Sequence, residues 1–348
     1  MKLKTRAAGK HTFSKTVLTL AALVILLIAF TLMDLAWAGT RTLSLGEVWA
    51  ALMGNGTWGT EAIVINQNLP RILTAIFVGA GLAVTGCVMQ AVFRNPLATP
   101  YILGLSSGAS VGAAIAILFS IPLIPIAIAQ PVMAFLMCLL TTLLVYTVSR
   151  SGGSMVRTET LVLAGVAISS LFSAVVSFLT YIAPSEQMGD IVFWSLGNLE
   201  KADIGDVMII ATVVITGIVL MLTQSRNLNA MMIGDAHAMD LGVDVRKVRI
   251  GLLIVSSLVV AASVAFVGTI GFVGLVIPHI LRMILGPDNR IIIPMSIVGG
   301  ATFLMIGDWA AHALSPLFGV LPIGVVTALV GAPFFIYLLC RKKKEVGW

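Results

Sequence analysis

The chain has 348 residues, of which 59% are hydrophobic and only 10% are charged. A soluble domain needs far more charge to cover its surface, so this composition excludes a chain built of soluble domains and indicates a polytopic membrane protein. The net charge of +6 does not require a nucleic-acid partner, because the basic residues gather next to apolar segments, where they set membrane orientation.

Ten apolar segments are predicted to be membrane-crossing helices in one transmembrane domain, residues 1–348, so the predicted fold class is all-α. They lie at about 16–37, 70–93, 101–120, 125–149, 160–183, 204–223, 249–268, 272–286, 291–313 and 321–340. Segments 101–120 and 272–286 are the weakest, being Gly/Ser-rich or short, and short interrupted helices often lie beside a permeation path. The first segment is expected to be a retained span, because Ala36-Trp37-Ala38 is only a faint signal-peptide cleavage site.

Lysine and arginine residues set the orientation of these spans. If both termini are cytoplasmic, 18 of the 21 basic residues lie on the cytoplasmic side, and only Arg41, Arg71 and Lys201 lie outside. An odd number of spans would break this segregation. The sequence therefore predicts a multi-pass protein of the cytoplasmic (inner) membrane, with the basic tail 341–344 anchored among anionic lipid headgroups.

Two segments on the predicted outer side are more than linkers. Ser44-Leu45-Gly46-Glu47 has the spacing of a helix capping box, and the apolar residues that follow predict a short amphipathic helix. Residues 184–206 hold five of the 15 acidic residues. This second segment is either a solvated loop or a landing surface for a soluble partner.

The stretch 69–109 is heavily punctuated. Ile72–Phe93 is 22 residues long without a charge and ends at Arg94-Asn95-Pro96, while Gly79, Gly81 and Gly86 within it favour close packing against other helices. The next apolar segment opens after a second proline. An ordinary membrane helix does not need such a break, so we expect a transport pathway with a gate at this turn.

The chain has no G-x-x-x-x-G-K-[ST] phosphate-binding loop, so ATP-driven transport would need a separate subunit to hold ATP and Mg²⁺. The longest predicted cytoplasmic loop, 224–249, is where that subunit would dock. Segments 227–233 and 236–241 are expected to form two short helices, with turns at Gly234 and Gly242. No catalytic residue, metal site or cofactor is predicted on this chain.

Asp308 is the one acidic residue that we place well inside an apolar run. A buried carboxylate usually has a partner, and His312, four residues further along the helix, can supply it. We expect a structural pair near the outer surface, with a proton relay as the alternative.

Several motifs follow one another between residues 69 and 339. They are Leu69-Pro70-Arg71, RNPLA at 94–98, GLSSGA at 104–109, WSLGNL at 194–199, LGV at 241–243, GFVGLVIPHILR at 271–282 and LPIGVVTALVGAPFFIYLL at 321–339. In this order they closely resemble the ABC-transporter permeases for ferric siderophores, heme and cobalamin (the FecCD type). The resemblance implies a type II ABC importer permease.

The resemblance also implies three groups of functional residues. The family's cytoplasmic gate, where two permease copies meet, matches Asn95, Leu97, Thr158 and Glu159. The segment that couples to the ATPase matches Gly234, Asp235, Ala238, Asp240, Leu241, Gly242 and Val243. Docking of an external binding protein relies on arginines, for which the matching positions are Arg71, Asn68 and His312.

The chain departs from the family at several of these positions. Glu159 replaces a small hydroxyl residue of some relatives, and helix capping by Thr158 and Glu159 is an equal alternative to a gate role. Met239 stands where arginine is common, which removes one expected salt bridge to the ATPase. Asn68 and His312 stand where relatives can have arginine, so the docking surface has fewer charges.

Together these features predict the transmembrane permease subunit of an ATP-driven, binding-protein-dependent importer of an iron chelate. A ferric siderophore is the first choice by base rate, with heme or cobalamin next. The expected partners are a second copy in a homodimer with alternating access at its interface, two ATP-binding cassette ATPase subunits, an external or periplasmic substrate-binding protein, and membrane lipid. The alternative, an ion-coupled secondary transporter, commonly needs intramembrane ionisable groups, and only Asp308 is expected to qualify. A membrane enzyme is a remote third reading, since no catalytic grouping is recognisable.

Overall fold

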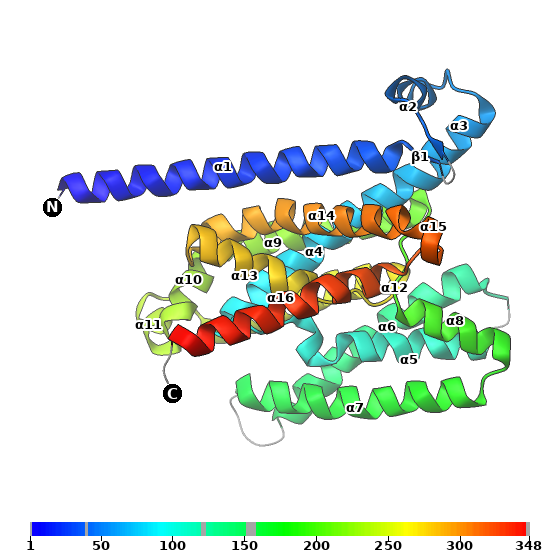
Figure 1. Cartoon of the computed structure of the whole chain (residues 1–348). Helices are drawn as coiled ribbons and strands as arrows, with labels where there is room; N and C mark the ends of the chain where they lie inside the picture. The colour runs from blue at the N-terminus through cyan, green and yellow to red at the C-terminus, as the bar shows by residue number, and fades with distance from the viewer. Residues whose placement is uncertain (1, 39–40, 120–122, 151–157, 346–348) are drawn as a thin grey trace.

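The computed structural model describes residues 2–38, 41–119, 123–150 and 158–345, which form a bundle of helices (Figure 1). Within these residues, seven helices are long and apolar enough to cross a membrane. They are α1 (Lys2–Leu35), α4 (Leu69–Val92), α6 (Ile126–Arg150), α7 (Thr158–Ile182), α9 (Ile204–Thr223), α12 (Val245–Val267) and α14 (Asn289–Ala313). Three shorter apolar stretches accompany them: α5 (Leu105–Leu118), α13 (Val273–Leu285) and the part Ile323–Tyr337 of α16 (Ile323–Glu345).

These helices lie at the ten predicted positions, so the all-α polytopic fold is confirmed. The two segments predicted as weakest are α5 and α13, and both are too short to cross a membrane as straight helices. The connecting elements are β1 (Trp37–Ala38), β2 (Arg41–Thr42), α2 (Leu45–Leu52), α3 (Trp58–Ile63), the π-helical turn η1 (Val64–Asn68), the 3₁₀ turn η2 (Pro100–Leu103), α8 (Ser185–Ser195), α10 (Ser225–Ile233), α11 (Asp235–Asp240) and α15 (Ser315–Phe318).

The bundle has two ends that differ in their connections. At one end lie α10 and α11, together with the first turns of α1 and the last turns of α16 (Figure 1). The other end holds α2, α3, α8 and α15 (Figure 1). We call them the α11 end and the α8 end. Since the chain starts and finishes at the same end, the helices make an even number of crossings, as the charge pattern predicts.

Helix α4 is the central helix, and nearly all of its residues are buried. Glycines let neighbouring backbones approach it directly. A Cβ atom at Gly79 would collide with the backbone of Gly300 on α14, and one at Gly86 would collide with the backbone of Gly274 on α13. The predicted role of these α4 glycines in close helix packing is confirmed.

Both short helices α5 and α13 follow a break in the chain. After α4, Arg94 has a left-handed backbone (φ 51°), and Gly104 (φ 74°) directly precedes α5. Phe272, directly before α13, likewise has a left-handed backbone (φ 68°). The two breaks are joined, because the Tyr101 hydroxyl donates a hydrogen bond to the carbonyl of Ile270 over 2.8 Å.

The two predicted outer segments are both ordered. Ser44 caps α2 with the full capping box, and Val48 is buried below it. Segment 184–206 forms α8 and is then hydrogen-bonded to the start of α16. The backbone amides of Ile323 and Gly324 donate to the carbonyls of Gly197 and Leu196. A loop is therefore wrong for residues 185–195, which form α8, whereas residues 196–203 are a loop and the acidic side chains of the segment are exposed at several positions. Its role as a landing surface stays a prediction.

Candidate functional site

A buried ionic cluster joins three helices at the α8 end. Arg71 on α4 places its Nε 3.0 Å from Oδ2 of Asp308 on α14, and its Nη2 3.9 Å from Oδ1 of Asp34 on α1. The side chains of Arg71 and Asp308 are 7% and 3% exposed, and that of Asp34 is fully buried. Because buried charges are stable only when paired, this cluster fixes the three helices to one another.

His312 connects this cluster to the surface. Its Nδ1 lies 2.8 Å from the carbonyl oxygen of Asp308, and 3.8 Å from the Asp308 carboxylate, so the predicted pair is present but Arg71 is the closer partner. Its Nε2 lies 2.7 Å from Nη1 of Arg71 and 3.3 Å from Oε1 of Glu200. Arginine can only donate a hydrogen bond, whereas a carboxylate accepts one. Nε2 of His312 therefore accepts from Arg71 when it is unprotonated and donates to Glu200 when it is protonated.

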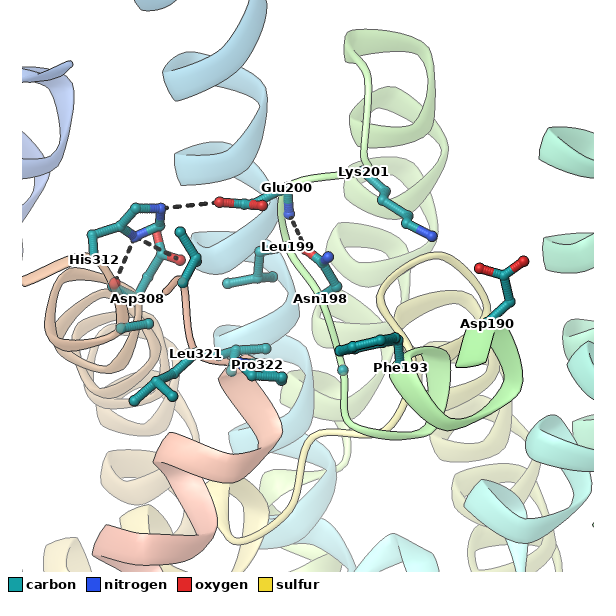
Figure 2. A pocket seen from close by; sticks show the side chains of 14 residues that line it. Asp190, Phe193, Asn198, Leu199, Glu200, Lys201, Asp308, His312, Leu321 and Pro322 are labelled. Carbon is teal, nitrogen blue, oxygen red and sulfur yellow. Dashed lines mark hydrogen bonds and ion pairs between the residues drawn. The ribbon is translucent and has the colours of Figure 1, made fainter. Parts of the chain in front are cut away.

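Glu200 lies at the mouth of a pocket of about 300 Å³ at the α8 end (Figure 2). The hydrogen bond from His312 holds the pKa of Glu200 below its ordinary value. Asp190 and Phe193 of α8 lie on one side of this pocket, and Leu321 and Pro322, just before α16, lie on the other (Figure 2). The pocket therefore joins exposed acidic groups to the buried cluster.

The structure buries the three predicted docking residues, Arg71, Asn68 and His312, and their docking role stays a prediction. All three residues are buried, at 6%, 3% and 3% exposure. The Asn68 side chain donates to the carbonyls of Trp37 and Leu35 at 2.7 and 3.2 Å, and Arg71 is neutralised by two carboxylates. These side chains hold the bundle together, and His312 also lines the pocket at the α8 end.

Two acidic residues of this cluster bear on earlier expectations. Asp34 is also buried inside a span, so Asp308 is not the one intramembrane acid. The position of Asp34 near the end of the first apolar run was the sequence signal that could have predicted its burial. Ligand atoms of Asp34, Asp308 and His312 lie within 4.8 Å of one another, a spacing that suits a cation. The Arg71 guanidinium already supplies the positive charge there, which disfavours a metal ion at this place.

At the α11 end, Asp235 is the meeting point of three segments. It begins α11 and accepts from Nη2 of Arg249 on α12 at 2.9 Å and 3.0 Å. Nη2 of Arg94, in the break after α4, lies 3.5 Å from the same carboxylate. Sequence reasoning placed Asp235 in the coupling segment but missed both arginines, because their pairing joins residues far apart in the chain.

The two short helices predicted in loop 224–249 are confirmed as α10 and α11. Gly234 (φ 157°) and Gly242 (φ 81°) form the turns, as expected. Ala238 is fully buried against Met231, whereas Asp240, Leu241 and Gly242 are exposed, and Val243 is half-buried. Two of the exposed side chains in this segment are apolar, since Met239 and Leu241 are 59% and 62% exposed.

Helix α10 is tied to the rest of the bundle by polar contacts. The Asn229 amide donates to Asp288 at 2.6 Å and its oxygen accepts from the backbone of Asn289 at 2.8 Å. A hydrogen bond from Arg290 lowers the pKa of Asp288 to about 2. The paired segment α10–α11 is therefore anchored to α14, so a force on α11 reaches the bundle.

The predicted gate residues lie at the α11 end in two separate places. Asn95 and Leu97 are exposed in the break after α4, where the Asn95 side-chain oxygen accepts from the Leu97 amide at 3.0 Å. Thr158 and Glu159 begin α7, and Glu159 is exposed. The Thr158 side chain lies outside the described residues. The gate role of these four residues stays a prediction.

Comparison with known proteins gives consistent matches. The FecCD transport family matches residues 23–341. The hemin transport system permease protein of Yersinia pestis is 39% identical over 332 residues, covering 94% of this chain and 97% of the relative. The cobalamin import system permease protein of Halobacterium salinarum is 40% identical over 294 residues, 84% of this chain and 77% of the relative. A solved metal-chelate type ABC transporter in an inward-facing conformation is 33% identical with a TM-score of 0.81, covering 92% of this chain and 98% of that chain.

Proposed function

Because the chain belongs to the FecCD transport family, as the permease subunit of an ABC importer, we propose that it forms the membrane pathway for an iron chelate. Hydrolysis of ATP belongs to separate subunits of such importers, in keeping with a chain that has no phosphate-binding loop. A substrate-binding protein delivers the cargo to the α8 end.

The observation that carries this proposal is the link between Asp235 and Arg94. The exposed surface of α11, with Met239 and Leu241, is shaped to seat against a partner, and Asp235 connects that helix to the break after α4. A movement imposed on α11 by the ATPase would thereby reach the turn that holds Asn95 and Leu97. Coupling between sites needs such a differential contact between states.

We assign the α11 end to the cytoplasm and the α8 end to the outside. The distribution of lysine and arginine supports this orientation. Two copies of the permease are proposed to face one another around the pathway and to alternate access at their interface, because paired nucleotide sites on two ATPase subunits require a two-fold arrangement. The exposed gate residues would then narrow the cytoplasmic exit.

The cargo is best sought among iron chelates. A ferric siderophore is the expectation from base rates, and the similarity to a hemin permease over nearly its whole length makes heme an equally direct candidate. Cobalamin comes next, through the relative from Halobacterium salinarum.

Reconstitution tests this function. The permease, its ATPase and its binding protein are placed in liposomes, and uptake of ferric siderophore, heme and cobalamin is measured with ATP and with a proton gradient separately. Uptake that follows ATP and ignores the gradient supports the proposal. Uptake that follows the gradient without ATP would establish an ion-coupled transporter instead.

A further inference from the structure

An open groove runs between α6 and α12 at the α11 end. Its deeper part, about 380 Å³, is lined mostly by apolar side chains of these two helices, among them Leu139, Leu143 and Ile254. Leu103 of η2 and Leu161 of α7 complete the lining. Its outer part, about 430 Å³, is lined by charged residues and by part of the α11 segment. Tyr146 and Ile250 line both parts, so the two parts adjoin at these side chains.

The length of this groove matches one leaflet of a membrane. Arg246 in the outer part and Leu258 in the deeper part are separated by about 18 Å along α12, at a rise of about 1.5 Å per residue. Half of a hydrocarbon core of about 30 Å is about 15 Å. A chain lying in the groove would therefore reach from the headgroup level to the middle of the bilayer.

The outer part has positive charge without a partner. Asp235 is paired with Arg249 and Arg94, and Asp244 is paired with Lys247 at 3.0 Å. Arg150 and Arg246 also line this part and are exposed, and no ion pair joins either of them to the described residues. Two arginines at the end of an apolar groove attract an anion that carries a hydrocarbon tail.

We propose that this groove binds an anionic phospholipid. One acyl chain lies between α6 and α12, and the phosphate is held by Arg150 and Arg246. The headgroup then lies beside the Asp235–Arg249 ion pair. The site does not depend on which cargo the permease carries.

Charge complementarity selects this occupant. A zwitterionic lipid would fill the apolar part but would add a cation beside two arginines. A soluble phosphate would satisfy the arginines but would leave the apolar part empty. Only a lipid with a net negative headgroup matches both parts of the groove.

The test is a titration of the full-length permease, purified in detergent, with dioleoyl phosphatidylglycerol or dioleoyl phosphatidylcholine, followed by native mass spectrometry and thermal unfolding. Phosphatidylglycerol is expected to bind at least tenfold more tightly and to raise the unfolding temperature. The double variant Arg150→Gln/Arg246→Gln should lose this preference. The control Lys15→Gln/Arg226→Gln removes the same charge from residues that do not line the groove, and should keep this preference.

A second pair of variants tests the apolar part. Leu143→Trp fills the groove and should weaken phosphatidylglycerol binding at least tenfold, whereas Leu140→Trp, on the same helix but outside the groove lining, should not. Equal binding of both lipids, or an unaffected arginine double variant, would overturn the proposal. So would glycerol phosphate competing as strongly as the lipid, or a disulfide between two Leu143→Cys copies, which would place a second permease in the groove.

Discussion

Arg94 and Asp235 lie within 3.5 Å of each other although one follows the central helix α4 and the other begins the exposed helix α11. The predicted gate turn and the predicted coupling segment are therefore in direct contact. Arg249 completes the arrangement, so that α4, α11 and α12 meet at one carboxylate.

Replacing Asp235 by Asn should uncouple α11 from the gate turn. The ion pair with Arg94, whose side chain is 43% exposed, contributes at most about 1 kcal/mol of stability. The pair with Arg249, whose side chain is 15% exposed, adds about 1–3 kcal/mol. Transport and cargo-stimulated ATPase activity should fall much further than the unfolding temperature does. Asp190→Asn, at the opposite end, is the control. Normal stimulation in Asp235→Asn would remove this contact from the coupling mechanism.

Arg71→Met should destabilise the bundle strongly. It leaves the carboxylates of Asp308 and Asp34 buried without their cation, at a cost of about 3–5 kcal/mol. Thermal unfolding in detergent measures the loss, and Lys201→Met, exposed at the same end, should be close to neutral. Adding Asp308→Asn to Arg71→Met should restore part of the stability. An Arg71→Met protein as stable as the Lys201→Met protein would show that the cluster is not structural.

Glu200→Gln should change how stability depends on pH. The hydrogen bond from His312 lowers the pKa of Glu200 from its ordinary value of 4.5, so the ionised form contributes stability above pH 4.5. That contribution is lost as the pH falls through the lower folded-state pKa. Wild type should therefore exceed Glu200→Gln at pH 6 by a margin of up to about 1 kcal/mol, since Glu200 is half exposed.

Unfolding temperatures of both proteins between pH 6 and pH 3 check this prediction. The two curves should approach each other as the pH falls below 4.5 towards the lowered pKa of Glu200. Glu186→Gln, an exposed change on α8, serves as the reference for a carboxylate outside the cluster. A constant difference over the whole range would show that the His312 contact does not act through the charge of Glu200.

Gly79→Ala should destabilise the protein by about 1–3 kcal/mol, because the new methyl group meets the backbone of Gly300 and the two helices must separate. Gly251→Ala on α12 is the matched control. A Cβ atom there meets nothing within 4 Å, so removing the helical glycine should stabilise by up to about 1 kcal/mol. Opposite shifts in unfolding temperature are expected, and equal shifts would contradict the direct backbone contact.

The features that could be predicted from the sequence are those with local signals. The lengths of the apolar segments predicted where the helices lie, and Gly234 and Gly242 predicted the turns on either side of α11. The pairing of Arg71 with Asp308 joins residues far apart in the chain, so nothing near either one signals it. The resemblance to a docking arginine predicted a surface position for Arg71. In the structure the side chain is buried beside the carboxylates of Asp34 and Asp308. Whether a charge in a membrane protein faces outward or inward depends on packing that one sequence does not display.

The glycine contacts of α4 limit how the protein can move. With no side chains between their backbones at Gly79–Gly300 and Gly86–Gly274, helices α4, α13 and α14 cannot slide past one another without breaking that fit. We therefore expect the three helices to move as one body. Opening and closing of a pathway must take place around this unit, at the helices that surround it, and the unit supplies the fixed frame against which they turn.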